Sequence, residues 1–161
     1  MPLIKELARD AAESALTDYW DGEFPVDPTK IAWKLGIAVL QGELEDGQSG
    51  MIIKPGDKDK PVIVLNTLES AQRRNFTCAH ELGHYFERLR NGDNEYSFVE
   101  SRTAAMDAHE WYANWFAAHL LMPEPEFRRA YDAGHTDTQL AARFGVSTAA
   151  VRTRKRNLNL A

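Results

Sequence analysis

The stretch His80-Glu81-Leu82-Gly83-His84 lies within residues 73–86, which the sequence predicts to be one continuous helix. Two residues four apart on a helix differ by about 40° of rotation and about 6 Å of rise, so both imidazoles leave the same face and can share one metal ion. Glu81 is next to that face, where it can accept a proton from an attacking water. We therefore interpret the pentad as a hydrolytic zinc site.

Apolar residues around the pentad support this interpretation over the alternative of two solvated surface histidines. They indicate a buried helix, in which paired histidines need a partner such as a metal ion. The flanking residues are Phe76, Ala79, Leu82, Tyr85 and Phe86.

A second apolar helix, predicted over residues 104–122 and stopped by Pro123, contains candidates for a further ligand. A catalytic zinc ion usually takes three protein ligands and keeps a fourth position for water. The candidates are Asp107, His109 and Glu110. Glu110 lies on a face made otherwise of small and apolar residues and Asn114, where a carboxylate is costly unless a cation meets it.

The two helical segments together carry a combination of motifs that resembles the ImmA/IrrE family of metallopeptidases. The matching residues are Arg74-Asn75-Phe76-Thr77 before His80-Glu81-Leu82-Gly83-His84, then Glu110-Trp111-Tyr112-Ala113-Asn114 running into Leu120-Leu121-Met122-Pro123. The resemblance extends from about Gly50 to the end of the sequence. It implies that Glu110 is the third zinc ligand and that Asn114 steadies a ligand or the helix backbone, rather than being a plain surface residue.

The resemblance also implies a function. It suggests a small intracellular endopeptidase that cleaves a transcriptional repressor, often encoded beside it, in phage-like elements, mobile elements or stress responses. A zincin-like fold is expected, with helices around a small sheet.

Length and composition predict one domain with at most a small appendage, because 161 residues with 43% apolar content are ordinary for a globular protein. Residues 1–6 lack a hydrophobic signal core and no apolar run is long enough to span a bilayer, so we expect a cytoplasmic protein without membrane association. The single cysteine, Cys78, excludes an internal disulfide and suits a reducing cytoplasm. We interpret it as a small buried hydrophobe rather than a thiol sensor.

The residues before the pentad predict scaffold elements. Helical periodicity covers residues 3–19, and Asp27-Pro28 opens a short helix that ends at Gly36. Strand-like runs follow at 37–40, 50–54 and 61–65, the last two forming a hairpin, which predicts a mainly antiparallel sheet. An edge strand of this sheet either pairs with an extended substrate or is an ordinary solvated edge. Residues 90–103 read as a loop, either a lid or a linker.

The C-terminal residues resemble a helix-turn-helix over 138–152, after a helix at 126–131 that ends at Gly134. Gly145 permits the tight turn and Ser147 caps the following helix. The predicted fold is therefore α+β, with a zincin-like metallopeptidase domain at 1–125 and a helix-turn-helix-like subdomain at 126–161 packed on it.

Charge is divided unevenly along the chain. The formal net charge is −5, but the residues after Asp137 carry five basic residues and no acid, which leaves −10 on residues 1–137. Arg152, Arg154 and Arg156 on the last helix can contact either an acidic partner protein or DNA phosphates. Docking of a protein is favoured over DNA reading, because the acidic body repels a duplex and no dimerisation element is visible.

The sequence thus predicts a zinc endopeptidase that cleaves a repressor or antitoxin, with His80, His84 and Glu110 as ligands and Glu81 as general base. The alternative is a DNA- or partner-binding regulator in which the metal site is structural or idle. An electrophilic group that stabilises the tetrahedral intermediate is also expected. Its candidates, among which the sequence does not choose, are Tyr85, Tyr96, Tyr112, His119 and His135.

Overall fold

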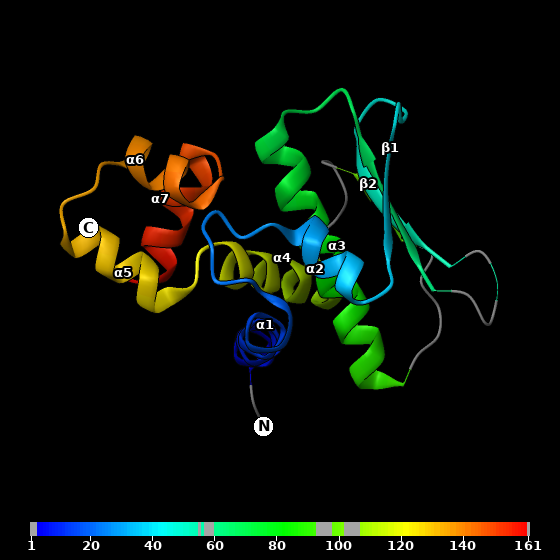
Figure 1. The fold of residues 1–161 in the computed structure, drawn as a ribbon, viewed down its shortest axis with the longest axis horizontal. Helices are drawn as coiled ribbons and strands as arrows, with labels where there is room; N and C mark the ends of the chain where they lie inside the picture. The colour runs from blue at the N-terminus through cyan, green and yellow to red at the C-terminus, as the bar shows by residue number, and fades with distance from the viewer. Residues whose placement is uncertain (1–2, 55, 57–59, 93–97, 102–106, 161) are drawn as a thin grey trace.

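The computed structural model has an α+β fold in which helices surround one small sheet (Figure 1), and it describes residues 3–54, 56, 60–92, 98–101 and 107–160. Seven helices and four strands lie within these residues. In chain order they are α1 (Ile4–Tyr19), α2 (Pro28–Lys34), β1 (Ala38–Gly42), β2 (Gln48–Ile53), β3 (Val62–Asn66), α3 (Ala71–Asn91), β4 (Phe98–Ser101), α4 (Ala108–Leu121), α5 (Glu124–Asp132), α6 (Asp137–Phe144) and α7 (Thr148–Asn157).

The sheet is mixed, with the strand order β1-β3-β2-β4. β2 pairs antiparallel with both β3 and β4, whereas β1 runs parallel to β3. Ile52 and Ile63, which are paired in the register of β2 and β3, are both fully buried. The expected hairpin and the mainly antiparallel sheet are therefore confirmed, and β1 and β4 are the edges.

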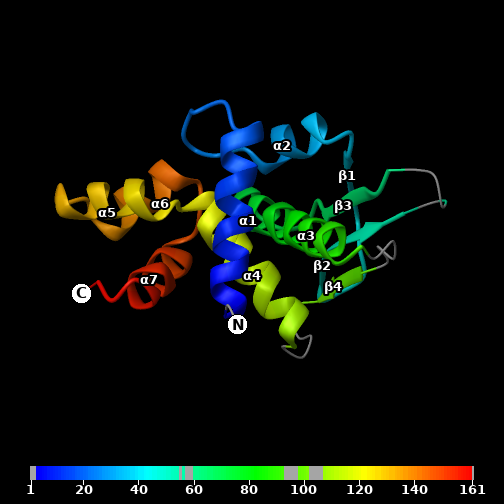
Figure 2. The ribbon, with the colours of Figure 1, turned by 90° about the horizontal axis from the view of Figure 1, so that it is seen from below.

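Helices α3 and α4 form the centre of the molecule (Figure 2). α3 packs against β2 and β3 on one side and against α4 on the other, while α4 also packs along α1. α5, α6 and α7 lie at the end of the molecule away from the sheet. The two segments that the sequence singled out therefore lie side by side between the sheet and the C-terminal helices.

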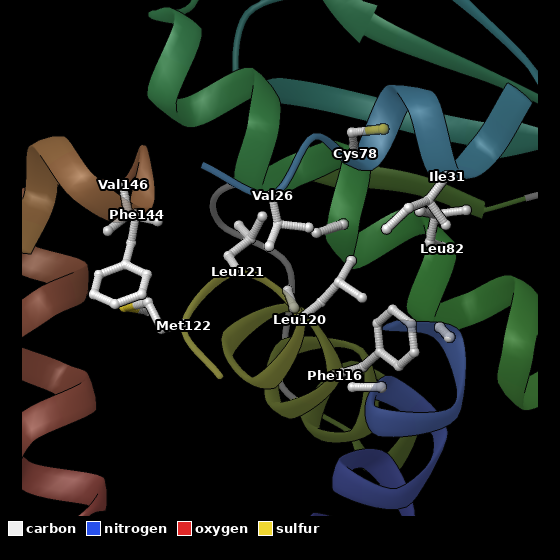
Figure 3. Packing of buried hydrophobic residues seen from close by; sticks show 14 of the residues in the cluster. Val26, Ile31, Cys78, Leu82, Phe116, Leu120, Leu121, Met122, Phe144 and Val146 are labelled. Carbon is white, nitrogen blue, oxygen red and sulfur yellow. The ribbon is translucent and has the colours of Figure 1, made fainter. Parts of the chain in front are cut away.

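The hydrophobic core extends through both parts of this arrangement (Figure 3). Leu82 of α3 and Phe116 of α4 are fully buried near Ile31 of α2, whereas Met122 at the end of α4 lies beside Phe144 and Val146. One continuous cluster of buried residues thus joins the C-terminal helices to the central pair.

Three expectations need correction or extension. Residues 98–103 were expected to be loop, but β4 occupies Phe98–Ser101, because its strand state is fixed by pairing with the distant β2 and not by its own short apolar pattern. α3 continues to Asn91 and ends at Gly92, which has φ 69°. α5 begins at Glu124, since Pro125 is tolerated in the first turn of a helix.

The remaining expectations on these segments stay predictions. Residues 93–97 and 102–106 lie outside the described residues. The interpretation of residues 90–103 as a lid or a linker and the predicted helix start at residue 104 therefore stay predictions. The division of the chain at residue 125, which falls within α5, and the helix-turn-helix assignment also stay predictions. None of the described helices is both long and apolar enough to cross a membrane.

Candidate metal centre

Helix α3 carries His80 and His84 on one face, as their spacing predicts. Ser70 starts the helix by accepting a hydrogen bond from the backbone N–H of Arg73, which satisfies an otherwise free donor of the first turn. The two imidazole rings are 4.8 Å apart between centroids and nearly perpendicular, at 84°. His80 is 6% exposed and His84 is fully buried.

Helix α4 brings Glu110 to the same place. Asp107 caps this helix by accepting a 2.9 Å hydrogen bond from the backbone N–H of Glu110, so the cap sets the backbone of the residue that carries the carboxylate. A close crossing at Gly83 lets α4 approach α3.

The three side chains converge on one point. Oε2 of Glu110 lies 3.0 Å from Nε2 of His80, and Oε1 lies 3.1 Å from Nε2 of His84. Each of the three residues offers one ligand atom, and all of these atoms lie within 4.8 Å of one another. Ligand atoms at about 2.0 to 2.1 Å from a tetrahedral zinc ion are about 3.3 Å apart, so the donor set and its spacing fit zinc after small movements.

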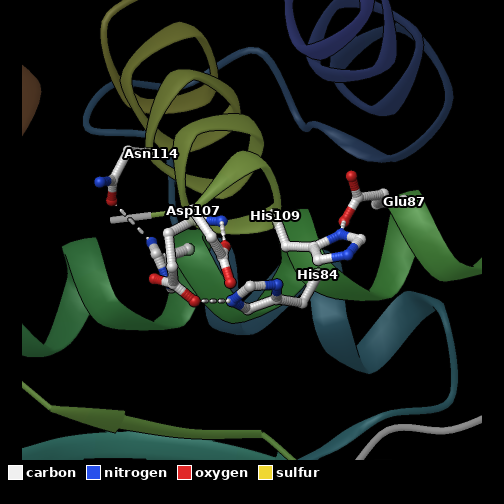
Figure 4. A network of polar contacts seen from close by, with 7 residues as sticks. His84, Glu87, Asp107, His109 and Asn114 are labelled. Carbon is white, nitrogen blue, oxygen red and sulfur yellow. Dashed lines mark hydrogen bonds and ion pairs between the residues drawn. The ribbon is translucent and has the colours of Figure 1, made fainter. Parts of the chain in front are cut away.

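The outer nitrogen of His80 is held by Asn114, one turn after Glu110 on α4 (Figure 4). Nδ1 of His80 donates a 2.8 Å hydrogen bond to Oδ1 of Asn114. This bond fixes the orientation of the ring, so that Nε2 faces the carboxylate of Glu110. The predicted contact of Asn114 with one of the candidate ligands, His80, is present in the structure.

The charge of Glu110 is favoured where it lies. Burial by itself raises the pKa of a carboxyl group, but hydrogen bonds and electrostatic attraction from His80 and His84 outweigh burial and hold the pKa of Glu110 well below its usual range. The carboxylate is therefore in its metal-binding form at neutral pH.

The two other candidates on α4 do not join the cluster. Asp107 is used as the helix cap. His109 instead donates from Nδ1 to Oε1 of Glu87 on α3, at 2.8 Å, so it ties the start of α4 to α3 (Figure 4). The sequence offered no clear signal for this pair, because Glu87 is a helix residue three positions beyond His84 with no motif around it.

Glu81 and Cys78, the other notable residues of α3, are both fully buried. Glu81 follows His80 directly, beside the ligand cluster. Burial raises the pKa of the Cys78 thiol to about 12, and the nearby hydroxyl of Thr29 lowers it only in part. Cys78 is therefore protonated at neutral pH, as expected for a small buried hydrophobe.

The cluster opens into a groove with a volume of about 800 Å³, which we call the α3–α4–α7 groove. His80, Glu110 and Asn114 line it, and its other walls come from residues 70–77 of α3 and its cap, residues 111–122 of α4 and its end, and residues 146–157 around α7. None of the four described candidates for stabilising a tetrahedral intermediate (Tyr85, Tyr112, His119 and His135) is among the lining residues, and Tyr96 lies outside the described part.

The basic C-terminal residues do not form one exposed row. Arg154 is only 1% exposed. Its Nε donates to the backbone oxygen of Met122 and its Nη2 donates to Nδ1 of His119, both at 3.1 Å. The expectation that Arg154 joins Arg152 and Arg156 on a solvated face was therefore wrong. A signal was present, because Arg154 shares its face of α7 with the apolar Val151.

An H-E-x-x-H helix crossed by a second helix that supplies a carboxylate is the arrangement of a zinc metallopeptidase site. Residues 32–155 match the family described as the IrrE N-terminal-like domain, a peptidase family. The chain therefore belongs to the ImmA/IrrE family of metallopeptidases.

Individual relatives agree with this assignment. The chain is 31% identical over 112 residues to Metallopeptidase ImmA of Bacillus subtilis (strain 168), covering 68% of this chain and 63% of that one. It is 37% identical over 99 residues to the uncharacterized immunity region protein 2 of Bacillus phage phi105, covering 61% and 60%. The chain thus spans about three fifths of the length of these relatives.

A solved structure shares the fold. A Mycobacterium tuberculosis transcriptional regulator superposes with a TM-score of 0.61 at 22% identity, covering 93% of this chain and 50% of the other.

Proposed function

We propose that this protein is a zinc-dependent endopeptidase whose metal is held by His80, His84 and Glu110. The observation that carries the proposal is the convergence of these three side chains, two of which, His80 and Glu110, line the α3–α4–α7 groove. The cluster supplies three protein ligands, the number typical of catalytic zinc, and the groove gives a polypeptide access to it.

A bound zinc ion would act as a Lewis acid that lowers the pKa of its water toward about 7 and polarises the carbonyl group of the scissile bond. Glu81 accepts the proton of the attacking water and passes it to the leaving amine. Asn114 orients His80 through the 2.8 Å hydrogen bond to Nδ1. His84 is fully buried and is not among the residues that line the groove, and its Nε2 lies 3.1 Å from Oε1 of Glu110.

The substrate that we propose is a transcriptional repressor or an antitoxin. Membership in the ImmA/IrrE family supports a protein substrate, and the phage relative is named for an immunity region. The most direct source of a candidate is the neighbouring gene.

Two substitutions test the chemistry separately from the metal. Glu81→Gln keeps the shape of the side chain but not its basicity, so we expect zinc binding and folding to persist while cleavage falls by a factor of about 10² to 10⁴. Glu110→Ala should lose most of the zinc, measured by elemental analysis after dialysis. Asp107→Ala and His109→Ala are the matched controls and should retain it.

The outcomes separate this proposal from a regulator with an idle site. Retention of zinc by Glu110→Ala would contradict the ligand assignment, and equal cleavage by Glu81→Gln would contradict the mechanism. If the protein binds zinc but does not cleave a repressor encoded beside it, a partner-binding role is favoured.

A further inference from the structure

The inner face of α7 forms a wall of the groove that leads to the metal cluster. Ala149, Ala150, Thr153 and Asn157 all line the α3–α4–α7 groove, at the spacing of one helix face. Their side chains are short, so they leave room for a ligand rather than filling the groove. The helix that was expected to dock a partner or read DNA therefore turns one side toward the candidate active site.

Arg154, which follows Thr153 and also lines the groove, is a buried cation that makes no ion pair with a carboxylate among the described residues. The partners of its Nε and Nη2 are a backbone oxygen and the ring of His119, whose pKa burial and Arg154 itself lower to about 4, so this ring is neutral. The remaining nitrogen, Nη1, is buried and has no hydrogen-bond partner in the part of the chain that the structure describes. No described carboxylate lies within 4.0 Å of the guanidinium.

Such an arrangement is costly for the isolated protein. Burial lowers the pKa of Arg154 to about 10, and the electrostatic attraction of Glu124 offsets this effect only in part. A buried guanidinium is normally paired with a carboxylate, often through two parallel hydrogen bonds. Because Arg154 also lines the groove, a ligand entering there can supply the missing carboxylate.

The distance along α4 fits a polypeptide ligand. Glu110 and His119 are nine residues apart on this helix, which corresponds to about 14 Å at about 1.5 Å per residue. An extended chain rises about 3.3 Å per residue and covers this distance with about four residues. The groove volume of about 800 Å³ also leaves room for several side chains.

We propose that the α3–α4–α7 groove binds a segment of the polypeptide substrate next to the scissile bond, and that Arg154 pairs with an aspartate or glutamate about four residues from that bond. This inference rests on the proposed peptidase function and names the chemistry of its substrate. The C-terminal helices are then part of the substrate-binding site, and the acidic character of the substrate segment is a requirement for recognition.

Selection of peptides tests the inference without knowledge of the natural substrate. The full chain carrying Glu81→Gln, loaded with zinc, is immobilised and panned with a phage-displayed library of random dodecapeptides, so that bound peptides are not cut. We expect enrichment of Asp and Glu over Asn and Gln. Arg154→Met in the same background should abolish this enrichment, whereas Arg152→Met, a matched change on the exposed side of α7, should preserve it.

A synthetic peptide from the selection is then used to measure the coupling between its acidic residue and Arg154. Replacing its enriched acid by the amide should weaken binding about tenfold or more in a fluorescence anisotropy titration, but less than twofold with Arg154→Met. Circular dichroism checks that Arg154→Met is folded. Arg154→Lys, which keeps the charge, provides a second variant. The comparison of the acidic peptide with its amide on the chain that retains Arg154 does not depend on any substitution of Arg154.

Each outcome decides the question. No enrichment of acids, or enrichment that persists in Arg154→Met, would show that Arg154 only ties α7 to α4 and would overturn the inference. Carboxylate binding that depends on Arg154 supports the groove assignment. If the chain with Glu81 intact then leaves the selected peptide uncut, that result counts against the peptidase proposal and not against the groove.

Discussion

Gly83 of α3 and Ala113 of α4 lie so close together that a Cβ atom on Gly83 would be 2.9 Å from the Cα atom of Ala113. Real Cβ atoms do not approach backbone this closely, so any larger residue at 83 must push the two helices apart. Because Gly83 lies between His80 and His84, and Ala113 one turn after Glu110, this crossing sets the distance between the two histidines and their carboxylate partner.

Gly83→Ala should therefore weaken both the fold and the metal site. Alanine gains up to about 1 kcal/mol over glycine inside a helix, but overpacking a tight contact costs about 1 to 3 kcal/mol, so we expect net destabilisation. Zinc affinity should fall as well, because Glu110 moves with α4. Chemical denaturation and competition with a zinc indicator measure the two effects.

Gly42→Ala is the matched control, since a Cβ on Gly42 would meet nothing within 4 Å. It should leave zinc affinity unchanged. Equal zinc affinity of Gly83→Ala and the unchanged protein would show that the close crossing does not position the ligands.

Asn114→Leu should lower zinc affinity about 10- to 100-fold while leaving one zinc ion per chain at saturation, because the hydrogen bond that orients His80 is lost but no ligand is removed. Asn114→Asp keeps an acceptor at the same place and should bind zinc more tightly than Asn114→Leu. Isothermal titration of zinc into the metal-free protein compares the three. Identical affinities would assign Asn114 a purely structural role.

Much of this arrangement is readable in the sequence, because it depends on local spacing. The helical period places His80 and His84 together, whereas the caps formed by Ser70 and Asp107 were not predicted, and Asp107 had been considered as a ligand. Glu110 was predicted as a ligand because its carboxylate lies on an otherwise small and apolar helix face. β4 was missed because its pairing with β2 joins residues about fifty positions apart, and nothing within its four residues encodes that partner.

The groove and the burial of Arg154 were missed for a related reason. Both depend on how α7 packs against the end of α4, which is a contact between residues 32 apart, and the apolar Val151 on the same face of α7 was the local sign of this burial. An arginine next to a basic run looks solvated by composition. Only the three-dimensional position shows that this guanidinium caps the carboxyl end of α4 at Met122 and contacts His119.

Acid should destabilise the protein through His119. Burial and the nearby Arg154 lower the pKa of His119 to about 4, against about 6.5 for an exposed histidine. Between these values the unfolded chain binds the proton and the folded chain does not, so stability is full above pH 6.5 and falls as the pH drops to 4. The loss by pH 4 from this residue is roughly 3 kcal/mol.

His119→Asn isolates this contribution, since the amide oxygen can accept from Arg154 but does not titrate. Urea denaturation of the metal-free forms at pH 7 and pH 4.5 should show a smaller loss of unfolding free energy for His119→Asn than for the unchanged protein. Parallel losses in the two proteins would place the acid sensitivity elsewhere, for example in the metal ligands.

The last prediction is that the chain alone does not read a DNA sequence. Of the basic residues on α7, Arg154 is buried, and Arg152 and Lys155 both pair with Asp137 at the start of α6, with the Arg152 contact at 3.4 Å. These pairs neutralise part of the positive charge that a duplex would need, and residues 1–137 carry a formal −10 that repels phosphate.

A selection from a pool of random duplexes at about 150 mM salt measures this directly, because specific readers typically bind at 10⁻⁸ to 10⁻¹¹ M under such conditions. We expect no enriched sequence, and only weak binding at low salt that falls steeply as salt is added. An enriched motif that is bound at about 150 mM salt and lost on replacing Arg152 and Arg156 by alanine would instead assign α7 to DNA recognition. Helix α7 would then serve two ligands, DNA on its exposed side and the peptide in the α3–α4–α7 groove, which Thr153 and Asn157 line.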